Sequence, residues 1–150
     1  MILFLVTGAG AGYCPRMPGT IGTLMAIPLS VALNLIASTS LPLAFLLWLA
    51  SVASAIALST KGAEILGQKD PARIVVDEMA GFLTASFCAP PGIVPLALAF
   101  VLFRLFDIVK VYPASALEKL PGGTGIVLDD VAAGFYTLGI IQLLSFGGML

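Results

Sequence analysis

Five acidic residues of this 150-residue chain stand at the edges of long apolar stretches, each near a basic residue: Asp77, Glu78, Asp107, Asp129 and Asp130. Carboxylates are costly in an apolar environment unless they face a cation or water. The chain has no histidine, and oxygen ligands without histidine or paired thiolates are typical of a Mg²⁺ site. Five carboxylates at one place would repel one another unless a cation lay among them. The pattern therefore predicts a magnesium and acid–base centre, provided that the fold brings these residues together.

Basic residues accompany these acids in an arrangement that favours phosphate chemistry. Arg104, Asp107 and Lys110 follow one another at intervals of three, so they are neighbours on a helix. Arg104 lies deepest in its apolar stretch, where a guanidinium needs an anion such as phosphate. Arg16 precedes another apolar stretch, and free backbone amides at a helix start also suit phosphate. A metal centre flanked by Arg and Lys predicts a phosphate substrate.

Hydroxyls and a glycine-rich loop complete the predicted binding groups, since glycines let backbone amides approach an anion closely. We expect the phosphate to be bound by Arg16, Thr20, Thr23, Arg104, Lys110, Gly122, Gly123 and Gly125. Each signal also has an ordinary structural explanation: a solvated helix end, a local ion-pair ladder, a helix cap or a turn. The functional interpretation therefore depends on the separate acidic segments meeting.

Several phosphatase mechanisms are excluded by residue type. Without histidine, no phosphohistidine intermediate is available. The residues six after Cys14 and Cys88 are Thr20 and Val94, so no Cys-x5-Arg nucleophile loop is present. No Asp-x-Asp motif exists, which disfavours an aspartyl-phosphate route. Attack by a metal-activated water, with a carboxylate as base, remains, and the sequence does not assign which carboxylate.

The charges fall into three islands, and long uncharged stretches separate them. Arg16 stands alone, seven charges lie between residues 61 and 78, and seven lie between 104 and 130. The chain is 59% hydrophobic and 10% charged, whereas soluble domains carry about 25% charged residues. The uncharged stretches are long enough to cross a bilayer and return, which would gather the charges near one face. A multi-pass membrane protein is therefore predicted, and a very apolar soluble bundle is the alternative. The net charge of −1 favours no nucleic acid partner.

We predict a single all-α domain over 1–150, a membrane bundle of about five long helices. These are expected over 20–37, 41–59, 71–89, 93–109 and from between 126 and 130 to about 144, with a short additional helix near 113–120. Asp70 is the expected N-cap of the third helix, with Pro71 at its first position. The apolar segment 1–6 lacks the basic region of a secretory signal and is expected to belong to the fold. The basic loops share one side, which the positive-inside rule places in the cytoplasm.

The motifs resemble those of the bacterial phosphatidylglycerophosphatase A family. Four blocks match in order: Pro15-x-x-Pro18-Gly19-Thr20-x-Gly22-Thr23-Leu24; Asp70-Pro71 with Val76-Asp77-Glu78-x-x-Gly81; Phe103-Arg104-x-Phe106-Asp107-Ile108-x-Lys110; and Gly122-Gly123-x-Gly125-Ile126 with Asp129-Asp130-x-x-Ala133-Gly134-x-Tyr136. Departures from the family pattern, such as Val111 and Val127, touch no carboxylate.

The resemblance implies a Mg²⁺-dependent phosphatase (EC 3.1.3.27) of the bacterial inner membrane. Its substrate would be phosphatidylglycerophosphate, converted to phosphatidylglycerol and phosphate on the cytoplasmic side, with membrane lipids as surroundings and no obligate protein partner. Two alternatives from the residues alone stay open. An ion or proton transporter would use the acids as a relay for its ion. A Mg²⁺-dependent lipid phosphotransferase would, like the phosphatase, use carboxylates to bind Mg²⁺. The number of metals and the existence of a covalent intermediate also stay open.

Overall fold

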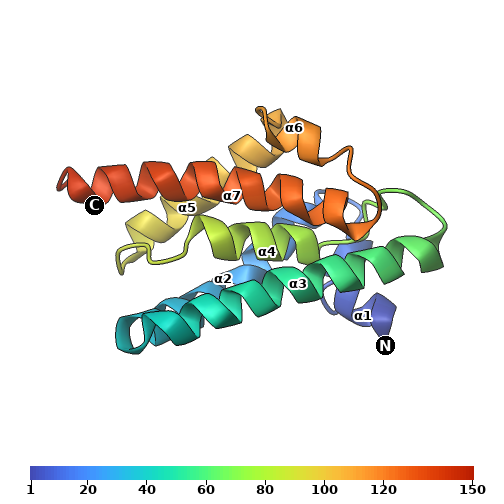
Figure 1. Cartoon of the computed structure of the whole chain (residues 1–150), viewed down its shortest axis with the longest axis horizontal. Helices are drawn as coiled ribbons and strands as arrows, with labels where there is room; N and C mark the ends of the chain where they lie inside the picture. The colour runs from blue at the N-terminus through green and yellow to red at the C-terminus, as the bar shows by residue number, and fades with distance from the viewer.

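The computed structural model describes residues 1–150 and contains only helices, turns and loops. The elements in chain order are α1 (Ile2–Val6), η1 (Ala11–Tyr13), α2 (Pro18–Thr39), α3 (Leu41–Leu66), α4 (Val76–Ala85), α5 (Ile93–Val109), α6 (Ala114–Leu117) and α7 (Gly123–Phe146). Figure 1 shows α2, α3, α5 and α7 running roughly along the long axis of the molecule, with the chain termini at opposite ends. The predicted all-helical, multi-pass architecture is confirmed.

Three helices are long and apolar enough to cross a membrane: α2, α3 and α7, with 22, 26 and 24 residues. At 1.5 Å per residue they extend about 33, 39 and 36 Å, against a hydrocarbon core of about 30 Å. Large apolar side chains such as Leu29, Leu35 and Leu46 are exposed along α2 and α3, as expected of surfaces that face lipid. The C-terminal end of α3 carries Lys61 and Glu64, the first charged residues after its apolar stretch.

The short helix α4 lies at the centre of the bundle, where it contacts α2, α3, α5 and α7 (Figure 1). Residues 80 to 85 are all buried. Phe82 is fully buried among small residues and Phe103, in a cluster that includes Ala26 of α2 and Ala133 of α7. Because the small residues let the neighbouring helices approach closely, the first turn of α4 is held inside the bundle.

The predicted start of this helix at Pro71, with Asp70 as N-cap, is wrong. The helix begins at Val76, five residues later, and Val75 is its N-cap. The Val75 N–H donates to the Val6 carbonyl, 3.0 Å away, so the segment pairs with the end of α1. The β-branched run Ile74-Val75-Val76 also has low helix propensity. The helix ends at Ala85, before Pro90 is reached. Just after this end, the Asn34 side chain of α2 donates a hydrogen bond to the Ser86 carbonyl at 2.8 Å.

Two other helix ends differ from the sequence prediction because of local caps. Helix α3 continues seven residues past 59 and ends at Gly67, whose φ of 65° is the left-handed conformation that terminates helices. Helix α7 begins at Gly123, three residues before the earliest expected start, because the Gly123 N–H donates to Thr60 Oγ1 of α3 at 3.0 Å. The α2, α5 and short α6 helices lie within two residues of, or inside, their predicted ranges.

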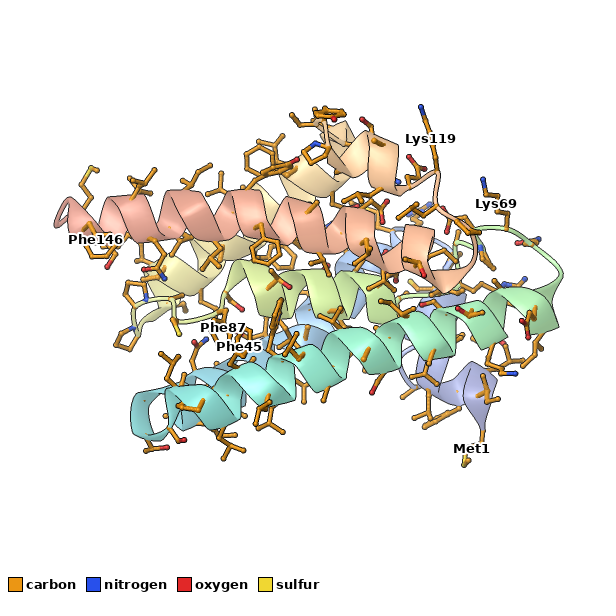
Figure 2. All side chains as sticks on the ribbon, viewed as in Figure 1. Met1, Phe45, Lys69, Phe87, Lys119 and Phe146 are labelled. Carbon is orange, nitrogen blue, oxygen red and sulfur yellow. The ribbon has the colours of Figure 1, made fainter.

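Polar and apolar ends of the molecule are clearly separated. Figure 2 shows Lys69 and Lys119 at the same end as the N-terminus, while Phe146 lies at the opposite end. The turn between α2 and α3 and the turn before α5 carry no charge. The loops that bring charged residues to one end therefore surround the entrance to the bundle interior beside α4.

Candidate active site

All five acids singled out in the sequence line one cavity of about 150 Å³. Its walls come from the α3–α4 loop, the first turn of α4, the end of α5 and the first turns of α7. They consist of Asp70, Pro71, Ala72, Ile74, Asp77, Glu78, Asp107, Lys110, Ile126, Asp129 and Asp130. Asp77, Asp129 and Asp130 are 8%, 5% and 4% exposed, so these carboxylates lie in the interior of a membrane bundle. Acids from three helices are therefore concentrated at one small space.

Three of these acids form a compact group that fits a divalent metal. Single carboxylate oxygens of Asp77, Glu78 and Asp130 all lie within 4.8 Å of one another. Asp77 Oδ1 and Glu78 Oε2 are buried and have no hydrogen-bond partner. Buried charged oxygens without partners are strongly destabilising, and an all-oxygen donor set is the one that Mg²⁺ and Ca²⁺ prefer. The residues present therefore fit a hard divalent cation held between α4 and α7.

Lys110 is the one basic residue that lines the cavity. Its Nζ lies 2.8 Å from Asp129 Oδ2 and 2.9 Å from Glu118 Oε1. Burial lowers the pKa of Lys110, but the hydrogen bonds and charges of Asp129 and Glu118 outweigh burial, so the pKa lies above its ordinary value. The ammonium therefore stays protonated at neutral pH and provides a fixed positive charge at the cavity wall.

Arg104 does not line the cavity, but it forms an ion pair with Asp107, which does. Its Nη1 is 2.6 Å from Asp107 Oδ2, in a pair whose side chains are 18% and 14% exposed. Gly19, in the first turn of α2, packs against both Glu78 and Arg104, and a β-carbon at Gly19 would overlap Glu78 Oε1. Glycine at this position thus makes room for the Glu78 carboxylate beside the guanidinium.

Three other residues predicted to bind phosphate do not line the cavity. Arg16 is exposed on the loop before α2. Thr23 is fully buried, and its hydroxyl donates to the Gly19 carbonyl at 2.9 Å, within α2. Thr20 Oγ1 is buried without a hydrogen-bond partner in the turn that holds Gly19. The structure thus places the two threonines in the helix that supports Glu78.

The three predicted glycines lie at the start of α7, outside the cavity. Gly122 has φ 63° and ψ −153°, a conformation open mainly to glycine. Gly123 packs against the Ile56 carbonyl and Thr60 of α3, and Gly125 packs against the Leu120 carbonyl. These contacts fix the first turn of α7, the helix that carries Asp129 and Asp130.

Sequence reasoning did not single out three residues that belong to this arrangement. Asp70 lines the cavity, although the sequence analysis treated it as a helix cap. Glu118 binds Lys110 from the α6 side. Gly19 packs on Glu78. The positions of Asp70 and Glu118 in the charged islands were a signal for both, while the contact of Gly19 has no signature in a single sequence.

The sequence is similar to one family model and to several known bacterial proteins. Residues 4–145 match the family model described as phosphatidylglycerophosphatase A. Two phosphatidylglycerophosphatase A proteins are similar: one from Escherichia coli is 30% identical over 94% of this chain and 81% of its own length, and one from Haemophilus influenzae is 32% identical over 97% and 89%. A protein from Bacteroides thetaiotaomicron, provisionally named phosphatidylinositol-3-phosphatase, is 37% identical over 91% and 89%. No solved structure matches the chain.

The family match covers every segment that lines the cavity, from Asp70 in the α3–α4 loop to Asp130 of α7. The resemblance that the four sequence blocks indicated is therefore confirmed. This chain belongs to the phosphatidylglycerophosphatase A family, and it is accordingly a membrane phosphatase of the phosphoric monoester hydrolase class (EC 3.1.3.27).

Proposed function

We propose that this protein is a Mg²⁺-dependent phosphatase that hydrolyses phosphatidylglycerophosphate to phosphatidylglycerol and phosphate. The observation that carries the proposal is the single cavity in which five acids meet Lys110. The substrate class comes from the family and from the names of the Escherichia coli and Haemophilus influenzae relatives. Its phosphomonoester would enter the cavity while its acyl chains stay in the surrounding lipid.

Asp77, Glu78 and Asp130 are the residues that would hold the metal. Their oxygens are close enough to share one ion, and two of them lack any other partner. When bound, Mg²⁺ would neutralise charge on the phosphoryl oxygens and make water a better nucleophile. We favour Mg²⁺ over Ca²⁺ because it needs few protein carboxylates and readily shares its remaining positions with water and a phosphate.

The other side chains of the cavity bind the phosphate and handle the proton. Lys110 would contact the phosphomonoester directly, and Arg104 would orient Asp107 through their close pair. A new bond forms between water oxygen and phosphorus while the bond from phosphorus to the glycerol oxygen breaks. One cavity carboxylate accepts the water proton, and the leaving glycerol oxygen receives a proton, so the reaction balances.

The two alternative functions find less support in this arrangement. A transporter that relays ions would need acids along the depth of the membrane. Here the five acids line one cavity beside the charged end of the bundle, and α7 carries no charge beyond Asp130. The family and the names of the Escherichia coli and Haemophilus influenzae relatives are those of phosphatases, which favours hydrolysis over phosphate transfer to a lipid alcohol.

The proposed location is the inner membrane, with the cavity open to the cytoplasm. Loops with basic residues favour the cytoplasmic side. Lys61, Lys69, Arg73 and Lys119 all belong to loops or helix ends around the charged end of the bundle. The substrate would therefore be met in the cytoplasmic headgroup layer.

Phosphate release by the purified protein tests the proposal. Wild-type protein in mixed micelles is expected to release phosphate from phosphatidylglycerophosphate with Mg²⁺, and to lose this activity in excess EDTA until Mg²⁺ is restored. Asp107→Asn and Asp130→Asn should each abolish the Mg²⁺-dependent release, by about 1000-fold or more, since each removes a charged oxygen from the centre. Glu64→Gln, which alters an exposed acid of α3 that does not line the cavity, is the matched control.

Insertion into the membrane and the far-UV circular dichroism of each variant should match those of the wild type. Full activity in both Asn variants would refute the assignment of these acids. Undiminished activity in EDTA would refute the metal requirement while leaving the phosphatase activity itself in place.

A further inference from the structure

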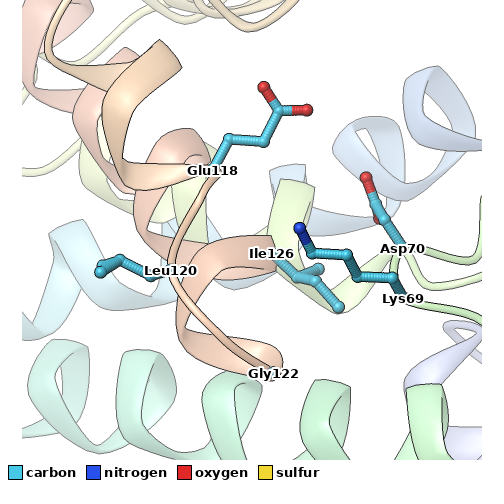
Figure 3. A pocket seen from close by; sticks show the side chains of 6 residues that line it. All are labelled: Lys69, Asp70, Glu118, Leu120, Gly122 and Ile126. Carbon is cyan, nitrogen blue, oxygen red and sulfur yellow. The ribbon is translucent and has the colours of Figure 1, made fainter.

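A second, smaller pocket lies beside the cavity, and the proposed reaction gives it no role. It has a volume of about 110 Å³ and is lined by Lys69, Asp70, Glu118, Leu120, Gly122 and Ile126 (Figure 3). Asp70 and Ile126 line the cavity as well, so the two spaces share a wall. Lys110 links them again, because its ammonium lies at the cavity and binds Glu118 at the pocket. A group attached to a phosphate in the cavity would therefore extend into this pocket.

The charged side chains of the pocket still have donor and acceptor atoms that could bind a ligand. Lys69 and Asp70 are exposed and form no ion pair with any other residue. In Figure 3 the Lys69 side chain extends across the pocket toward Ile126, with Asp70 and Glu118 on either side of its ammonium. Glu118 contacts Lys110 through Oε1 only, and its side chain is 45% exposed.

These three groups together restrict what the pocket can hold. A carboxylate repels a phosphate but accepts a hydrogen bond from a hydroxyl, so Asp70 and Glu118 suit an alcohol. An ammonium attracts a phosphate, so Lys69 suits a phosphodiester. A purely apolar group would leave Lys69 and Asp70 without partners, and a second phosphomonoester would bring more negative charge than a phosphodiester against the two carboxylates. The pocket therefore matches a hydroxylated group that is joined to a phosphodiester.

We infer that this pocket is the subsite for the remainder of the lipid headgroup. The phosphomonoester occupies the cavity, the hydroxyl of the bridging glycerol donates to Asp70 or Glu118, and the phosphodiester pairs with Lys69. The inference rests on the proposed function and deepens it, because it names the residues that bind the part of the substrate headgroup beyond its reacting phosphate. It also predicts discrimination against phosphatidic acid, whose phosphomonoester is attached directly to diacylglycerol and carries neither the bridging hydroxyl nor the second phosphate.

Two variants that touch only this pocket test the inference. Lys69→Met removes the positive charge, and Leu120→Trp fills the space with a larger side chain at a position that is 37% exposed. Each should raise KM for phosphatidylglycerophosphate about tenfold, the factor that corresponds to about 1.4 kcal/mol of lost binding. The inhibition constant of inorganic phosphate, which as the product needs only the cavity, should stay unchanged. Lys61→Met, an equal charge change at the exposed end of α3, should alter neither constant.

Each outcome of this measurement decides the matter. A rise in KM with an unchanged phosphate inhibition constant supports the subsite. Unchanged KM in both variants overturns it, and so does an equal rise in both constants, since that would place the effect in the cavity. A wild-type protein that releases no phosphate from the lipid would instead overturn the proposed function, and the subsite with it.

Discussion

At the scale of single residues, the acid cluster depends on groups that are not themselves acidic. Glu78 reaches the cavity only because Gly19 of α2 leaves its side chain room beside Arg104. Lys110 is fixed between Asp129 and Glu118, so its ammonium does not have to be ordered when a phosphate arrives. Gly19 and Glu78 lie far apart in the sequence, on α2 and α4, so the first of these supports depends on the tertiary fold.

Replacing Gly19 with alanine tests the first of these supports. The new β-carbon would overlap Glu78 Oε1, and the flexible carboxylate must move away from the Asp77–Asp130 group. We expect kcat/KM to fall by about 100-fold, the scale of a misplacement of about 1 Å at a reacting centre. The unfolding temperature should change little, because the end of a side chain gives way more easily than backbone.

The shorter acid in the double variant Gly19→Ala, Glu78→Asp should leave space for the new methyl group and recover part of the activity. Loss of activity that the double variant does not relieve at all would argue that Gly19 acts in another way. The Gly139→Ala variant of α7, where a β-carbon meets no atom within 4 Å, is the neutral control.

The residue types were predictable from the sequence, and their partners were less so. The five acids and Lys110 stand out because charges are rare in such an apolar chain, and the structure brings all six to one cavity. Arg104 pairs with Asp107, as their spacing of three predicted, and its expected role in phosphate binding stays a prediction. The contact of Gly19 depends on how α2 and α4 cross, and no pattern within either segment encodes that crossing.

At the scale of elements, the site is built on the contact between α4 and α7. Gly81 of α4 and Gly134 of α7 meet where the helices cross, and a β-carbon on Gly134 would lie 2.5 Å from the Gly81 carbonyl oxygen. Small residues allow such close crossings inside membranes. Asp77 and Glu78 precede the crossing by about one turn, as do Asp129 and Asp130, so the crossing sets the distance between the two acidic pairs.

Gly134→Ala should therefore damage both stability and the metal site. The obstacle is backbone, which cannot move aside without separating the helices, and overpacking of this kind costs about 1–3 kcal/mol. Thermal unfolding in detergent should show a lower midpoint than wild type, and the Mg²⁺ concentration for half-maximal activity should rise. Gly139→Ala, on the same helix, should leave both properties near wild type or slightly raise the midpoint. Equal behaviour of the two variants would show that the crossing is not tightly packed.

Helix existence was easier to predict than helix ends. The apolar parts of α2, α3, α5 and α7 were predictable from the sequence, because uncharged stretches of this length are typical of membrane-spanning helices. The start of α4 was misplaced by five residues, because the Val75 N–H finds its acceptor in Val6, far away in the chain. The start of α7 depends on Thr60 of another helix in the same way. Local sequence patterns do not predict helix ends that are fixed by hydrogen bonds to distant parts of the chain.

At the scale of the whole molecule, polarity is distributed along one axis. The charged loops and the cavity share one end, and the uncharged turns and the C-terminus occupy the other (Figures 1 and 2). This separation was predictable from the three islands of charge, because helices that cross and return must bring the islands together. The direction in which the molecule sits in its membrane is a separate proposal that follows from the basic residues alone.

The two native cysteines allow that direction to be measured. Both are free; Cys14 lies on the loop before α2 at the charged end, and the exposed Cys88 lies in the turn before α5. A membrane-impermeant maleimide added to spheroplasts should label Cys88 and spare Cys14, and inverted vesicles should give the opposite result. Burial raises the pKa of Cys88, so a mildly alkaline pH speeds its reaction.

The variants Cys14→Ser and Cys88→Ser identify which thiol carries the label in each preparation. Labelling of Cys14 from the outside of spheroplasts would place the cavity on the external face and contradict the proposed orientation.

Because the cavity lies at one end of the molecule, the reaction would take place on one side of the bilayer only. The acids are reached beside the end marked by Lys69 and Lys119, and the opposite end offers no comparable group. Every turnover would deliver its product lipid into the same monolayer. Newly made lipid would accumulate there, so supplying the other monolayer requires a separate step of transbilayer movement, and the pace of membrane growth on that side would follow the flipping rate instead of catalysis.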